Sequence, residues 1–164
     1  MKSLRFAVAA AVAAFAAGLA CAQAAPNADY TDMWWNTQQS GWGISFMQHG
    51  ANNQAYATWY TYDPRTRDPA TGQNKAMWVV MTGGTWTAPN TITGRAYVFN
   101  GVPFTQSGSN PRANDVGTFT FTFSDYSSGT FTYNLAAPAN LASNEPAYGL
   151  PAMSGSIPIT RFAF

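Results

Sequence analysis

The residues of this chain that are best suited to chemistry lie close together between Met33 and Gly43, in the run MWWNTQQSGWG. Its three tryptophans supply large apolar faces that stack on other rings or on the C–H faces of sugars. The neighbouring Asn36 and Gln39 supply neutral amides that both donate and accept hydrogen bonds. This combination predicts recognition of a small neutral ligand, a glycan or a protein partner.

Further aromatic and amide side chains along the chain extend this set. We predict that together they form an aromatic and amide rim at the mouth of the fold, with no metal and no cofactor. The eight candidate ligand-binding residues are Trp34, Trp35, Asn36, Gln39, Trp42, Gln48, Tyr60 and Trp78. The competing interpretation is that these rings only fill the interior of the protein.

The sequence offers little that favours catalysis. His49 is the single histidine, so a His-rich metal site cannot form. Ser40 lacks the G-x-S-x-G context, and a Ser40–His49 pair would still need an acid from elsewhere. The carboxylates lie mostly in loop-like sequence, where capping and solvated roles are common. No catalytic residue is assigned, and a non-enzymatic role is favoured.

The N-terminus has the features of a secretory signal. A cationic start precedes an apolar run from Phe6 to Ala20, which is too short to cross a membrane comfortably as a helix. The small-residue pattern Ala22-Gln23-Ala24 then resembles a cleavage site. We therefore expect residues 1–24 to be a signal peptide and residues 25–164 to form a single domain of an exported protein, periplasmic or extracellular.

Removal of that segment would leave a chain that lacks cysteine and has a net charge near zero. Cys21 is the only cysteine, so a disulfide scaffold, Cys-ligated zinc and a cysteine nucleophile are excluded. Lys75 would be the single lysine, which provides no electrostatic footprint for nucleic acid. The expected partner is a small molecule, a glycan or a protein, and not nucleic acid. Lipidation at Cys21 is an alternative that we favour less.

The elements that must position the aromatic residues are β-strands. Aromatic and β-branched residues dominate the chain after the signal, and no helical apolar pattern is longer than a turn or two. Short candidate strands are separated by Gly, Pro, Asn and Asp. They span residues 42–48, 54–62, 76–82, 84–88, 91–99, 116–123, 129–135 and 156–164. About eight short antiparallel strands predict an all-β fold, a small closed β-barrel, with a two-sheet sandwich as the alternative.

Alternation along the strands predicts which side chains face the interior. Three phenylalanines that end at Phe123 alternate with threonines, and pairing Phe123 with Phe131 gathers the aromatic rings of this hairpin on one face. Gly129 then supplies the positive φ of the turn. Trp59 shares its face with two alanines, which indicates inward packing, whereas the tyrosines on the opposite face fit a partly wet surface. Residues 76–82 are apolar on both faces and predict a covered strand.

Several of these segments resemble a recurring domain of exported bacterial proteins. The pattern there reads roughly W-W-N-P-x-E-S-G-W-G, followed by an A-T-W-F-x-Y-D strand and a P-x-W strand. The matching segments here are Trp34 to Asn36, Ser40 to Gly43, Gln48, Ala57 to Asp63, Met77-Trp78, Gly117 to Phe121, Gly129 to Tyr133 and Ile159 to Arg161. This chain departs from the pattern at Thr37 and Gln39, which stand where the domain has Pro and Glu, and residues 64–75 are longer than the expected turn. The resemblance implies an exported β domain to which no catalytic activity is attached.

Two further functions remain open at this point. A periplasmic hydrolase inhibitor would insert loop 100–115 or loop 136–155 into an enzyme cleft. An integral outer-membrane barrel is suggested by the C-terminal run Arg161 to Phe164 and by the alternating aromatic residues. Because the predicted strands are mostly about 7 residues long, and ~9–11 are needed to span a bilayer, membrane insertion is not favoured.

Overall fold

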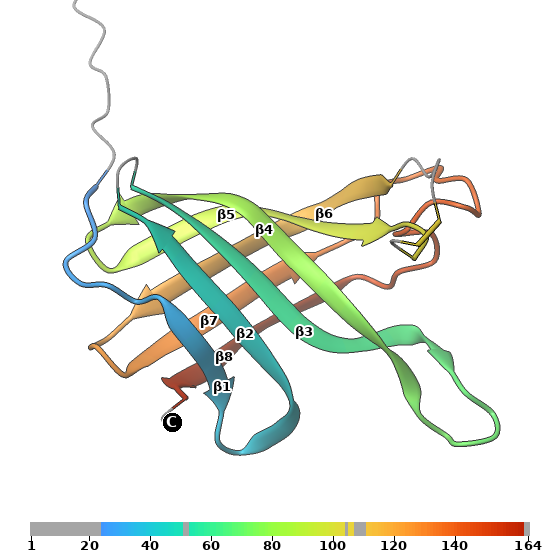
Figure 1. Cartoon of the computed structure of the whole chain (residues 1–164), viewed down its shortest axis with the longest axis horizontal. Helices are drawn as coiled ribbons and strands as arrows, with labels where there is room; N and C mark the ends of the chain where they lie inside the picture. The colour runs from blue at the N-terminus through green and yellow to red at the C-terminus, as the bar shows by residue number, and fades with distance from the viewer. Residues whose placement is uncertain (1–23, 51–52, 104, 107–110, 163–164) are drawn as a thin grey trace, which may run out of the picture.

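The computed structural model describes residues 24–50, 53–103, 105–106 and 111–162, and these residues form an all-β structure (Figure 1). Within them, eight strands follow one another in chain order around a closed antiparallel barrel, which confirms the predicted fold. The strands are β1 (Asp32–Asn36), β2 (Gln39–His49), β3 (Gln54–Arg67), β4 (Asn74–Ala88), β5 (Thr91–Asn100), β6 (Arg112–Phe123), β7 (Ser128–Leu135) and β8 (Met153–Arg161). The described residues contain no helix that is long and apolar enough to span a membrane.

Several strands are longer than the sequence predicted. Residues 32–36, which lie outside the predicted strands, form β1. Residues 76–82 and 84–88 belong to one strand, β4, which continues through a register shift against β5. Residues 63–75, between the predicted strands 54–62 and 76–82, are mostly strand as well, because β3 continues to Arg67 and only residues 68–73 connect it to β4. A bulge lets a strand absorb residues that break its alternation, and sequence alternation alone therefore underestimates strand length.

The hairpin of β6 and β7 has a register that differs by two residues from the predicted one. Phe121 pairs with Phe131, and Phe123 pairs with Gly129. Because the shift is even, the aromatic rings still share the inner face. Gly129 lies in the strand and not in the turn, and a Cβ there would come within 2.9 Å of a carbonyl oxygen of β6. The turn itself is formed by residues 124–127.

Aromatic side chains fill the interior of the barrel. The largest fully buried side chains include Trp34, Trp86, Phe46, Phe119, Phe121, Phe123 and Phe131. The rings of Phe121 and Phe131 stack at 5.0 Å, and Trp59 points inward beside Ala55 and Ala57, as predicted. Each large ring removes ~150–250 Å² from water, at roughly 25 cal/mol per Å², so this packing is the main favourable contribution to stability.

The two ends of the barrel differ in their connections (Figure 1). The turn end has short connections at residues 50–53, 89–90 and 124–127. The loop end has the two-residue turn at 37–38 and the longer connections at 68–73, 101–111 and 136–152. The segment before β1 crosses the turn end, where Tyr30 stacks on Phe123 at 3.9 Å and Ala24 donates its backbone N–H to Trp86. The expected signal segment lies outside the described residues except for Ala24.

The barrel closes at a short seam between β1 and β8. Two residue pairs join these strands, Trp34 with Arg161 and Trp35 with Thr160. A side chain extends the seam, because Asn36 Nδ2 donates to the carbonyl oxygen of Pro158 at 2.7 Å. Closure therefore depends on side chains as well as on the backbone ladder.

The side chain of Arg161 connects this seam to the turn end. Its guanidinium donates to Asp32 Oδ2 at 2.9 Å, to the carbonyl oxygen of Tyr126 at 2.8 Å and to that of Asp29 at 3.0 Å. It also lies over the rings of Trp34 and Tyr126, at 5.1 Å and 3.9 Å from their centroids. One side chain thus joins β8 to β1, to the segment before β1 and to the β6–β7 turn.

We predict that Arg161→Met destabilises the protein by roughly 2–4 kcal/mol, because it removes a largely buried cation and leaves several partners unsatisfied. Urea denaturation followed by intrinsic fluorescence measures this change. The matched control is Arg95→Met, since the ion pair of Arg95 with Asp115 is exposed and salt bridges of this kind contribute little. Equal losses of stability in both variants would contradict the role of Arg161 in closing the barrel.

Candidate ligand-binding site

The outer faces of β3, β4 and β5 bring exposed aromatic side chains into one row. Tyr60 of β3 pairs with Trp78 of β4. Because Val79 pairs with Val98, Phe99 of β5 lies at the next position on the other side of Trp78. The three side chains are 47%, 54% and 40% exposed, respectively. Alternation places them outside the barrel, since their strand neighbours face the core.

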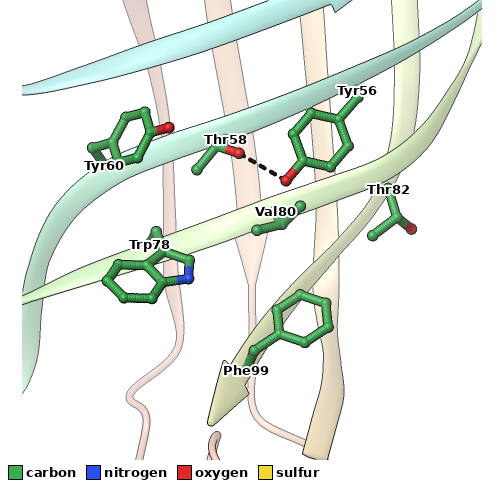
Figure 2. A pocket seen from close by; sticks show the side chains of 7 residues that line it. All are labelled: Tyr56, Thr58, Tyr60, Trp78, Val80, Thr82 and Phe99. Carbon is green, nitrogen blue, oxygen red and sulfur yellow. Dashed lines mark hydrogen bonds between the residues drawn. The ribbon is translucent and has the colours of Figure 1, made fainter. Parts of the chain in front are cut away.

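A groove of about 480 Å³ runs beside this row (Figure 2). We call it the outer groove, and it is lined by Tyr56, Thr58, Tyr60, Trp78, Val80, Thr82 and Phe99. Its floor is formed by Thr58 and Val80, which pair across β3 and β4 and are each only 5% exposed although they lie on the outer wall. The surrounding rings shelter these smaller side chains, so the wall is hollowed at this point.

The hydrogen-bonding groups of the outer groove are uncharged. Thr58 Oγ1 donates to Tyr56 Oη at 3.1 Å, and this bond holds the Tyr56 ring at the edge of the groove (Figure 2). The Tyr56 hydroxyl, acting as acceptor in that bond, keeps its own proton for donation to a ligand. Thr82 and Tyr60 add two more hydroxyls. The groove therefore combines apolar ring faces with hydroxyl donors and acceptors.

A second pocket, of about 290 Å³, lies against β1 and β2. We call it the β1–β2 pocket, and it is lined by Met33, Trp34, Trp35, Trp42, Gly43 and Phe162. The ring of Trp35 meets that of Phe162 edge to face at 5.5 Å. Trp42 is half-buried, and its ring contacts the inward-facing ring of Trp59 at 6.3 Å. The lining of this pocket is also uncharged.

Three of the predicted site residues hold the fold together. Trp34 is buried in the core and donates its indole N–H to the carbonyl oxygen of Tyr30 at 3.0 Å. Asn36 spans the seam, and its Oδ1 accepts a backbone N–H from the β1–β2 turn at 2.7 Å. Gln48 binds the segment before β1, because Oε1 accepts the N–H of Tyr30 and Nε2 donates to Ala28 at 3.2 Å.

The other five predicted residues lie at separate places, and one of them, Trp42, also packs against the core. Tyr60 and Trp78 line the outer groove, and Trp35 and Trp42 line the β1–β2 pocket. Gln39 is exposed at the start of β2, at the loop end. The structure therefore distributes the eight residues between the core, two pockets on the outer wall and the loop end, and does not gather them in one rim.

Sequence reasoning missed five residues that line the outer groove, namely Tyr56, Thr58, Val80, Thr82 and Phe99. Two signals pointed toward them. The tyrosines of β3 were expected on a partly wet face, and β4 was apolar on both faces. The apolar pattern of β4 predicts a strand that is covered on both sides. In the described residues, Trp78 on its outer face is instead more than half exposed.

An ion pair lies beside the outer groove, toward the loop end. Arg65 contacts Asp63 at 2.8 Å. The same guanidinium donates to the carbonyl oxygens of Pro146 at 2.6 Å and of Tyr148 at 2.9 Å. Arg65 therefore fastens the connection at residues 136–152 to the end of β3.

This ion pair also affects the titration of Asp63. Burial raises the pKa of the Asp63 carboxyl, but hydrogen bonds from Arg65 outweigh this effect and hold the pKa below its usual 3.8. The ion pair lines a pocket of about 150 Å³ together with Trp78 and Phe99. The charges next to the outer groove are thus paired with each other.

The geometry does not support the catalytic pair considered from the sequence. Ser40 and His49 lie near opposite ends of β2, nine residues apart, which corresponds to about 30 Å along a strand. The described residues contain no group of three or more His, Cys, Asp or Glu side chains that could hold a metal ion. Comparisons with family models, curated proteins and solved structures found no match to this chain.

We predict that Asp63→Asn lowers the stability of the protein at neutral pH by about 1–3 kcal/mol, because Arg65 loses its partner. The pKa of Asp63 is lower in the folded state, so its contribution is present above the unfolded value near 3.8 and is lost as pH falls through the folded value. Thermal unfolding of both proteins between neutral pH and pH ~3 measures the difference. The gap between the two curves should narrow on acidification, and a constant gap would contradict the assignment.

Proposed function

We propose that this protein is a non-enzymatic, exported β-barrel binding module, and that it binds a neutral glycan in the outer groove. The observation that carries this proposal is the row of half-exposed rings of Tyr60, Trp78 and Phe99 above an uncharged floor. Aromatic faces stack on the C–H faces of sugar rings, while hydroxyl groups bond the sugar hydroxyls at the edges. A contiguous exposed aromatic surface of this kind marks an interaction site.

The charge of the lining supports a neutral ligand. None of the side chains that line the outer groove is ionisable at neutral pH. Asp63 and Arg65, which line a pocket together with Trp78 and Phe99, form an ion pair and engage the connection at residues 136–152. A charged ligand would lose hydration in the groove without gaining a counter-charge. The volume of about 480 Å³ also falls within the range of small-molecule sites, about 300–1,000 Å³.

The inhibitor function receives less support from the loops. The connection at residues 136–152 is fastened to the barrel by Arg65, and Ala147 donates its backbone N–H to Asn114 at 2.9 Å. Pro146, Ala147 and Leu150 are buried against the protein itself. These contacts hold residues 146–150 of this loop against the barrel. The connection at residues 101–111 lies partly outside the described residues.

The distribution of side chains supports a barrel that faces water over one that spans the outer membrane. Strand length does not distinguish a water-facing barrel from a membrane-spanning one here, because β2, β3 and β4 have 11, 14 and 15 residues. A membrane barrel carries an apolar outer band, whereas the inner faces of β6 and β7 here hold the phenylalanines. Their outer faces carry threonines, and Thr120 and Thr132 form hydroxyl pairs with neighbouring strands at 2.9 and 3.0 Å.

The test is a glycan array probed with residues 25–164, followed by fluorescence titration of the neutral oligosaccharides that bind. Because Trp78 is exposed in the groove, its fluorescence should change on binding. Trp78→Ala and Tyr60→Ala should each weaken binding roughly tenfold or more, since each removes a stacking surface. The matched control is Tyr148→Ala, which removes an exposed tyrosine that does not line the groove.

Two results would overturn the proposal. The first is an array on which the protein binds no neutral glycan. The second is glycan binding that Trp78→Ala and Tyr60→Ala leave unchanged while both variants retain the thermal stability of the parent protein.

A further inference from the structure

We propose that the outer groove continues across Gly43 into the β1–β2 pocket, so that the bound glycan is an extended chain lying across β1 to β5. This inference rests on the proposed function and specifies the shape of its ligand. Different side chains line the two pockets. The strand register shows that they lie next to each other on the outer wall.

Register pairs define a path across the strands. Gly43 of β2 pairs with Tyr60 of β3, and Tyr60 pairs with Trp78 of β4. Gly43 faces outward, because the next residue, Ile44, is buried in the core. On the other side, the register of β1 against β2 shifts after Trp34, and Trp35 and Gly43 line the β1–β2 pocket together. The outer wall thus presents Trp35, Gly43, Tyr60 and Trp78 in succession, and Phe99 completes the path.

Gly43 is the low point of this path. It separates Trp35, in the β1–β2 pocket, from Tyr60, in the outer groove. The backbone there does not require glycine, because its φ is not positive. Packing does not require it either, since an added Cβ would meet only the carbonyl oxygen of Trp34, at an ordinary 3.6 Å. The missing side chain therefore has one structural effect, which is to leave a passage between the pockets open.

The dimensions and charge of the path suit a chain of several neutral sugars. Neighbouring strands lie about 4.8 Å apart, so the four steps from β1 to β5 cover roughly 19 Å. The path is uncharged in both pockets, and an aromatic ring stands at either side of Gly43. A single sugar would occupy one pocket, whereas an extended oligosaccharide would contact rings in both.

The experiment measures how affinity depends on chain length, by calorimetric titration of oligosaccharides of β-1,4-linked glucose, xylose and N-acetylglucosamine, from disaccharide to hexasaccharide. For a series that binds, the hexasaccharide should bind at least about tenfold more tightly than the disaccharide. Gly43→Gln should abolish this advantage and leave disaccharide binding unchanged, because the new side chain blocks the passage but not the outer groove. Trp35→Ala should have the same effect by removing the distant ring.

The matched control is Gly50→Gln, which adds the same side chain to open space at the turn end. It should keep the full dependence on chain length. Affinity that does not increase with length, or that increases equally in Gly43→Gln and Trp35→Ala, would overturn the extended path and leave the outer groove as the site. Failure of the parent protein to bind any neutral glycan, in these three series and on the array, would overturn the proposed function together with this inference.

Discussion

The seam between β1 and β8 is the constraint on which the rest of this structure depends, because it converts a sheet into a barrel with an inside. Two residue pairs, the bond from Asn36 to Pro158 and the contacts of Arg161 hold it closed. An open seam would expose the buried rings and leave two unpaired strand edges. The aromatic interior and the seam therefore stabilise each other, since burial of the rings requires closure and their packing draws the strands together.

Closure also divides the side chains of every strand between a packed interior and an outer wall, and the outer wall is not uniform. On β6 and β7 it carries threonines, whereas on β3 to β5 it carries the rings of Tyr60, Trp78 and Phe99. Core packing cannot account for rings on the outside of the barrel. These rings shelter Thr58 and Val80 and so hollow the wall, and Arg65 fastens the neighbouring loop beside them. The candidate site thus forms because large outward-facing rings surround smaller side chains on the curved wall of the barrel.

Much of the fold could be predicted because side chains alternate along strands. The inward direction of Trp59 and of the phenylalanines near residue 121 follows from that period of two, and it remained correct although the hairpin register was shifted by two residues. The length of β4 could not be predicted in the same way, since a bulge interrupts its alternation. The candidate site was the least predictable part. Trp34, Asn36 and Gln48 have the residue types of a binding site, yet their partners in the fold use those groups internally.

By itself, the sequence determined the fold class, the antiparallel order and the aromatic interior of this protein, because these depend on local composition and on alternation between neighbouring residues. The tertiary structure alone decided which outward residues become neighbours. Trp35, Gly43, Tyr60, Trp78 and Phe99 come from five strands. The last four share one level of the wall through the register of three strand pairs, and Trp35 adjoins Gly43 in the β1–β2 pocket. Register depends on turns, bulges and closure of the whole barrel, and a change of two residues in one pair would separate rings that no local pattern connects.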